Sequence, residues 1–132
     1  MTYNPSTDTL TSANFNGQSL TAKYADLAEK YSTDKEYAPG TVMEIGGDAE
    51  TTAWSGSDYI AGVVSTKPAY LMNSEADGLA IALVGRVPVR VFGAINKGSA
   101  VFAHADGTAS AESVGPIVGI ALQTNMDEGE KL

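Results

Sequence analysis

Residues 82–91 read ALVGRVPVRV, a stretch with the alternating pattern of a β-strand. Its odd-numbered positions are apolar or glycine and fall on one face of an extended strand: Leu83, Gly85, Val87, Val89 and Val91. Arg86 and Arg90 share the opposite face, with Pro88 between them. Because proline cannot donate a hydrogen bond to a neighbouring strand, the stretch predicts an edge strand, a bulge or a bend of a sheet.

The same β character continues along the chain from Tyr37 onward. Short runs rich in valine, isoleucine and threonine are separated by turn-forming pairs such as Pro-Gly, Asp-Gly and Lys-Gly. We predict strands at residues 41–45, 60–66, 80–84, 87–92, 100–103 and 117–123. The fold expected from this pattern is mainly β, a compact β-barrel or sandwich of short strands, with at most one short helix.

The N-terminal region differs from the rest in composition. Residues 1–23 are rich in threonine, serine and asparagine, and we expect an extended arm that is either loose or lies on a neighbouring subunit. Its sizeable apolar anchors are Leu10, Phe15 and Leu20. Residues 24–132 form the β-rich domain. Within residues 22–31 the apolar spacing fits a short amphipathic helix, but the segment is too short for a stable isolated helix, so a strand is the alternative.

The two halves of the domain resemble each other. PGTVMEIGGDAET at 39–51 aligns with KGSAVFAHADGTA at 97–109, an offset of 58 residues. IAGVVS at 60–65 aligns with IVGIAL at 117–122, which sets Gly62 opposite Gly119 at an offset of 57. A weak internal duplication would give a β structure with pseudo-twofold symmetry; chance reuse of turn residues is the alternative.

Composition excludes several classes of function. The 132-residue chain has 16 acidic residues against 8 lysines and arginines, a net charge of −8. This balance argues against general binding to nucleic acid or to anionic membranes, both of which need a basic surface. No apolar run is long enough to span a bilayer. Cysteine is absent, which excludes disulfides, thiol catalysis and thiolate metal sites.

Catalytic and cofactor patterns are weak. His104 is the single histidine; pairing with Asp106 would allow general-base chemistry, but a local hydrogen bond in an Asp-Gly turn is the simpler interpretation. Carboxylates that could hold calcium occur in two acidic loops that match no known calcium pattern: Asp48, Glu50, Asp127, Glu128 and Glu130. We therefore expect no catalytic residues, no metal and no cofactor, and a protein that is not an enzyme.

Two features remain as candidates for binding. Trp54 follows TTA in a polar loop and is either a ligand contact, for example to a sugar, or a cap on the core. Arg86 and Arg90 either protect an edge strand in water or meet a carboxylate of another subunit. We favour a subunit interface that contains Arg86, Pro88 and Arg90, together with two tyrosines, Tyr24 and Tyr31.

Five ordered motifs give the chain a family resemblance: YADLAEKY (24–31), YAPGTVMEIGG (37–47), AGVVSTKPAYLMN (61–73), ALVGRVPVRVFGAINKGS (82–99) and GPIVGIAL (115–122). Together they resemble the C-terminal knob domain of tailed-bacteriophage fibre and structural proteins, which is related to the self-cleaving intramolecular chaperones called peptidase G2 domains. In this comparison residues 1–23 look like the last segment of a stalk. The chain departs from the pattern at its end, MDEGEKL, where relatives continue into a further apolar strand.

The resemblance implies a trimeric, β-rich part of a virion. It implies a capsid decoration protein or a short fibre or knob subunit whose partners are itself and the major capsid protein or another virion protein. Such a protein would be made in the host cytoplasm and would stabilise the particle through its arm and its subunit contacts. The alternatives are a self-cleaving chaperone for fibre trimerisation, for which no matching cleavage serine is found, and a carbohydrate-binding fibre tip that uses Trp54.

Overall fold

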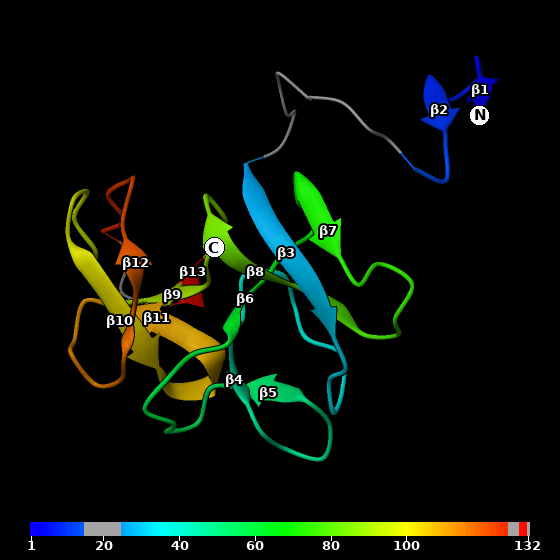
Figure 1. Cartoon of the computed structure of the whole chain (residues 1–132). Coiled ribbons are helices and arrows are strands. Elements are labelled where there is room, and N and C mark those ends of the chain that lie inside the picture. The colour runs from blue at the N-terminus through cyan, green and yellow to red at the C-terminus, as the bar shows by residue number, and fades with distance from the viewer. Residues whose placement is uncertain (15–24, 127–129, 132) are drawn as a thin grey trace.

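The computed structural model describes residues 1–14, 25–126 and 130–131, without the side chains of the last two (Figure 1). This described part is mainly β, as the sequence predicts, and its helical content is a single 3-10 turn, Ala105–Gly107. Its strands form two larger sheets and one hairpin. Both larger sheets are open, with strands at each edge, so the described chain forms no closed barrel.

The first sheet has six strands, all of which come from residues 26–85. Their order is β5 (Thr51–Ala53), β4 (Val42–Ile45), β6 (Gly62–Val64), β8 (Leu79–Gly85), β3 (Asp26–Tyr31) and β7 (Tyr70–Met72). All neighbours are antiparallel except β3 and β7, which are parallel. Of these strands, β5 and β7 were not predicted.

The short helix considered for residues 22–31 is wrong for its described part, which is strand β3. Residues 22–24 lie outside the described residues. β3 is hydrogen-bonded on both sides, to β8 and to β7, and its Ala28 is fully buried opposite Ala82. Two neighbouring strands satisfy the backbone of this short segment better than a helix of two turns could, so tertiary pairing overrides the apolar spacing.

The second sheet has five strands from the C-terminal half. Their order is β12 (Ile117–Ile120), β10 (Ala100–His104), β11 (Thr108–Ser110), β9 (Val91–Phe92) and β13 (Glu130–Lys131). The hairpin β10–β11 turns through Ala105–Gly107, where Asp106 adopts a positive φ of 59°. β9 joins β11 in parallel through a single register pair, Ala109 with Val91.

The N-terminal segment is a separate hairpin of β1 (Thr2–Asn4) and β2 (Thr9–Thr11). Every residue from 1 to 14 is exposed, and the tip is held by a hydrogen bond of 3.0 Å from the Tyr3 hydroxyl to Asp8. An isolated two-stranded hairpin is marginally stable in water. The described part of the expected arm is therefore a β element whose faces pack against nothing else described.

The two aligned halves have the same topology and register, as an internal duplication predicts. In each, a hairpin is followed by a strand that pairs antiparallel with the first strand of that hairpin, which gives β5-β4-β6 and β11-β10-β12. At offsets of 58 and 57 residues the register pairs correspond: Met43–Gly62 with Val101–Gly119, and Val42–Val63 with Ala100–Ile120.

The turn before each hairpin repeats as well. Gly40 and Gly98 both have a φ of 87°, a backbone conformation that favours glycine. The Gly40 amide donates to the Val64 carbonyl at 2.8 Å, and the Gly98 amide donates to the Ala121 carbonyl at 2.8 Å. Each half is thus a three-stranded unit closed by one glycine turn.

Two clusters of buried side chains hold the sheets. The larger combines both sheets: Val42, Trp54, Val63, Ile95, Val101, Ala103 and Ala109. The smaller lies within the six-stranded sheet: Met43, Val64 and Ile81. The larger cluster therefore joins the two duplicated units.

Candidate functional site

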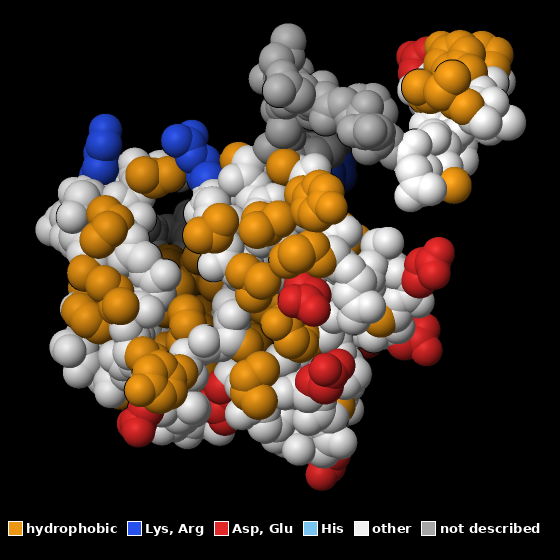
Figure 2. All heavy atoms as spheres, in the orientation of Figure 1, with side chains coloured by type: hydrophobic (Ala, Val, Ile, Leu, Met, Phe, Trp, Pro, Cys, Tyr) orange, Lys and Arg blue, Asp and Glu red, His pale blue; other side chains and the backbone are white. Residues whose placement is uncertain are grey.

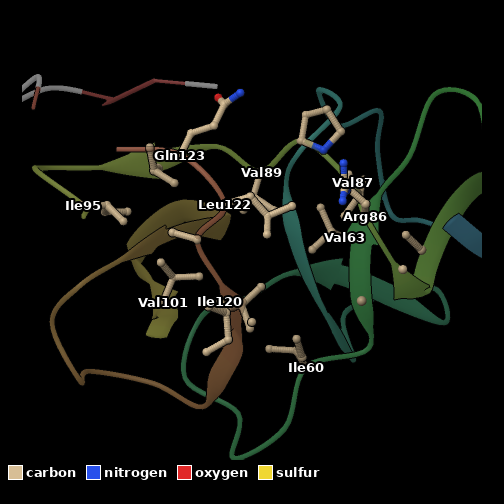
Figure 3. A pocket seen from close by; sticks show the side chains of 18 of the residues that line it. Ile60, Val63, Arg86, Val87, Val89, Ile95, Val101, Ile120, Leu122 and Gln123 are labelled. Carbon is tan, nitrogen blue, oxygen red and sulfur yellow. The ribbon is translucent and has the colours of Figure 1, made fainter. Parts of the chain in front are cut away.

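A cleft of about 1310 Å³ opens between the two sheets. Figure 2 shows it as a hollow with hydrophobic side chains inside, and Figure 3 shows Ile60, Val63, Val89 and Ile120 around it. Its lining comes from β6, β8 and the segment after β8 on one side and from β10 and the β12 region on the other. The cleft is mainly apolar and open to solvent.

Large apolar side chains at this cleft are unusually exposed. The exposed fractions are 66% for Val84, 57% for Ile120 and 54% for Leu122. Each apolar side chain that leaves water contributes on the order of 25 cal/mol per Å² buried. A contiguous exposed apolar surface of this kind marks a site of interaction with another molecule.

The stretch ALVGRVPVRV forms one wall of the cleft, but it is not a single strand. β8 ends at Gly85, residues 86–90 cross from one sheet to the other, and β9 begins at Val91. Pro88 lies in this crossing, which is the bend that the sequence offered as one of three alternatives. No strand pairs with the chain there, so the missing N–H of proline costs no ladder hydrogen bond. The crossing explains why a proline interrupts an otherwise regular alternation.

Arg90 ties the crossing to both sheets. Its backbone amide donates to the Gly40 carbonyl at 2.9 Å, and its carbonyl accepts from the Ala109 amide at 2.8 Å. Its guanidinium Nη1 donates to the Thr41 hydroxyl at 3.1 Å. Arg90 is therefore bonded within its own chain and is half-buried.

Arg86 has a different environment. Its side chain is exposed and lines the cleft, as does that of Lys97. Figure 2 shows Lys and Arg side chains along the upper rim of the hollow. The expectation that Arg86 and Arg90 share one strand face is wrong, because residues 86–90 form no strand; Arg86 lies at the cleft and Arg90 is bonded to Thr41.

Pro88 also lines the cleft, whereas Tyr31 does not. Tyr31 is half-buried against the smaller core cluster, and its hydroxyl donates to Glu29 at 3.2 Å. Burial raises the pKa of Tyr31, and the charge of Glu29 raises it further. Tyr24, Phe15 and Leu20 lie outside the described residues, whereas Leu10 in β2 is 60% exposed.

Trp54 occupies the core, as the alternative to a ligand contact predicted. Its side chain is 7% exposed within the larger cluster, and Nε1 donates to the Ser57 carbonyl at 2.8 Å. In this position the ring offers no open face to a sugar.

Glu44, which the sequence did not single out, holds the loop after Trp54. Its buried carboxylate accepts hydrogen bonds from the amides of Ser55 and Ser57 at 3.1 and 3.0 Å and from the Ser55 hydroxyl at 2.9 Å. Burial acts to raise the pKa of Glu44, but these hydrogen bonds outweigh it and lower the pKa below its ordinary value. The arrangement fixes a loop rather than a reacting group.

His104 makes structural contacts. Its ring stacks on Phe92 with centroids 5.3 Å apart, and Nδ1 lies 3.3 Å from the Thr108 hydroxyl. Asp106 is exposed in the adjacent turn. The local partner of His104 is therefore Thr108, and not Asp106 as the sequence suggested.

The acidic loops contain the carboxylates that were considered as calcium ligands, and the structure describes part of them. No three histidine or acidic side chains gather there as metal ligands would. Glu50 instead accepts a hydrogen bond from the Ser32 amide at 2.9 Å. Asp127 and Glu128 lie outside the described residues, as does the side chain of Glu130.

No helix within residues 1–14, 25–126 and 130–131 has the length and apolarity of a membrane span.

Comparison with known proteins adds no assignment. No protein-family model, no curated protein and no solved structure matches the chain. The structural feature that bears on function is the apolar cleft with its cationic rim.

Proposed function

We propose that the protein is a non-enzymatic structural subunit of a tailed-bacteriophage particle that works as a homotrimer. Its part in the particle is that of a capsid decoration protein or a short fibre or knob subunit. It stabilises the particle by packing against sister subunits and against the major capsid protein or another virion protein. The virion assignment rests on the five ordered sequence motifs.

The observation that carries self-association is the cleft between the sheets. Val84, Ile120 and Leu122 are each more than half exposed around it, which a subunit contact would correct. Arg86 and Lys97 line the same cleft, while the chain as a whole has a net charge of −8. A second copy therefore offers both apolar and acidic surface to this site. Association would also stabilise a small domain that has no disulfides.

The decoration and fibre interpretations differ in where the protein lies on the particle. Electron microscopy of intact particles labelled with an antibody to this chain tests the proposal directly. Label on the capsid surface supports decoration, and label at the tail supports a fibre or knob subunit. Particles that carry no label and no chain of this sequence would overturn the proposal.

Sedimentation equilibrium of the purified protein tests the trimer separately. The expected mass is three times that of the 13.6-kDa chain. Intact-mass spectrometry of the same sample tests the chaperone interpretation, because self-cleavage would produce two fragments in place of one full-length chain. A full-length mass supports the structural role.

A further inference from the structure

The internal duplication provides a template for what binds the cleft edge. β6 and β12 are equivalent strands of the two repeats. β6 is paired on both sides, with β4 on one and β8 on the other. β12 pairs with β10 and ends the five-stranded sheet, with no further described strand on its outer side. The position that β8 fills in the first repeat therefore has no counterpart among the described strands of the second.

The backbone of β12 is oriented for such a pairing. Ala121 donates to the Ser99 carbonyl at 2.9 Å, so the amide of residue 121 points inward, toward β10. Because strand residues alternate, the N–H of Ile120 points outward. Val63, the residue equivalent to Ile120, pairs with Ala82 of β8. β12 thus presents the same backbone groups that β6 uses to bind β8.

Gly119 provides an independent sign of a missing neighbour. At the equivalent Gly62, a Cβ atom would collide with the carbonyl oxygen of Ala82 and with Ile81, because β8 packs closely there. At Gly119 nothing lies within 4 Å of a Cβ, and its φ is not in the positive range. The described residues give no reason for glycine at 119, whereas a strand that packs there as closely as β8 packs on β6 would account for it.

The N-terminal hairpin has the properties of a docking strand. It is a β element whose residues are all exposed, with Tyr3 and Leu10 each 60% exposed. Both strands have an unpaired outer edge. Within the described residues, one chain therefore carries a strand edge without a neighbouring strand and an exposed hairpin.

We propose that the N-terminal hairpin of a second copy of this chain adds antiparallel to the outer edge of β12 and covers the mouth of the cleft. The contact deepens the self-association part of the proposed function and rests on it. It is heterologous, since hairpin meets β12 and never itself, so repetition around an axis gives a ring such as a trimer where the rotation closes.

Sedimentation equilibrium of three variants tests the contact. Ile120→Pro removes the outward N–H of an exposed edge position and keeps the inward hydrogen bonds, so the fold is expected to persist. Ile120→Val is the matched control, because it keeps both the N–H and a β-branched side chain. Deletion of residues 1–14 removes the donor hairpin. We expect I120P and the deletion to be monomers with an unchanged β-type circular dichroism spectrum, and I120V to remain trimeric.

Other outcomes overturn the inference and leave the virion assignment to its own test. An I120P variant that stays trimeric would exclude β12 as the contact. A deletion variant that stays trimeric while I120P is monomeric would exclude the hairpin as the occupant. A wild-type dimer that persists after deletion of residues 1–14 would show symmetric pairing of two β12 edges and would exclude the hairpin. A wild-type monomer in which hydrogen exchange protects the Ile120 amide would place the hairpin on its own chain.

Discussion

Glu44 is a single residue on which a whole loop depends. Its carboxylate receives three hydrogen bonds from Ser55 and Ser57, and the loop it fixes sets Trp54 into the core. Glu44→Gln weakens this set, and we expect a loss of about 1–3 kcal/mol in the free energy of unfolding at pH 7. Urea unfolding measures it. Asp48→Asn, which removes an exposed carboxylate nearby, serves as the control.

The stability difference between wild type and the Glu44→Gln variant is expected to depend on pH. Because the folded-state pKa of Glu44 is lowered from 4.5, its ionised form stabilises the fold above the unfolded-state pKa. That contribution is lost as the pH falls through the folded-state pKa. The stability difference between wild type and E44Q should therefore be full at pH 7 and shrink below about pH 4.5. A difference that stays constant down to pH 3 would show that the carboxylate charge does not matter.

Arg86 and Arg90 can be separated by substitution, although the sequence suggested one shared role. Arg90→Ala removes a hydrogen bond to Thr41 and half-buried packing, so we expect a loss of about 1–3 kcal/mol in stability. Arg86→Glu changes an exposed side chain, so we expect a free energy of unfolding within ~0.5 kcal/mol of wild type. We expect the association of subunits to be weaker. Thermal unfolding and sedimentation of both variants distinguish stability from assembly, and the reverse pattern would contradict these assignments.

Among the strands, alanine substitutions at the two equivalent glycines, Gly62 and Gly119, are expected to affect the stability of the subunit differently. Gly62→Ala forces a Cβ against Ala82 and Ile81 of β8 and is expected to cost about 1–3 kcal/mol or more. Gly119→Ala meets nothing in the isolated subunit, so its unfolding curve under monomeric conditions should match the wild type. Its trimer should nevertheless dissociate at higher protein concentration than the wild-type trimer. Equal association of G119A and wild type would show that no strand packs at that position.

The sequence predicted several apolar strands but missed the polar ones and the apolar strand β7, and it placed a strand at 87–92 where β9 is Val91–Phe92. Runs centred on residues 42–45, 62–64 and 117–120 became strands because valine and isoleucine suit a half-buried sheet. β5 and β11, Thr51–Ala53 and Thr108–Ser110, were missed because their small polar residues show no apolar alternation. They are strands because each pairs with the preceding strand of its hairpin. Since they occupy equivalent positions in the two repeats, recognising one of them would have predicted the other.

The cleft could not be predicted, because its two walls are far apart in sequence. Alternation showed that residues 82–91 are apolar on one side, but not that the chain leaves one sheet at Gly85 and enters the other at Val91. Trp54 and Glu44 were likewise unpredictable as a pair. Their burial depends on how the loop folds back over the core, which no local pattern encodes.

For the whole molecule, the cleft predicts a measurable hydrophobic surface. If subunits cover it, a dye such as ANS that fluoresces in apolar sites should bind the monomeric I120P variant more strongly per chain than the wild-type trimer. Circular dichroism of the variant serves as the control for unfolding. Equal fluorescence of the two proteins would show that assembly leaves the cleft open.

The crossing at residues 86–90 has a consequence for how the chain folds. Each repeat closes over a short sequence distance, within residues 40–64 and 98–121, so its hydrogen bonds can form quickly and in order during synthesis. Arg90, in contrast, bonds to Gly40 and Thr41, the latter 49 residues away, and to Ala109 in the later repeat. Its two-sided attachment must wait until both repeats exist. The arginine that the sequence placed on a strand face is thus a residue whose contacts depend on both repeats and join them into one domain.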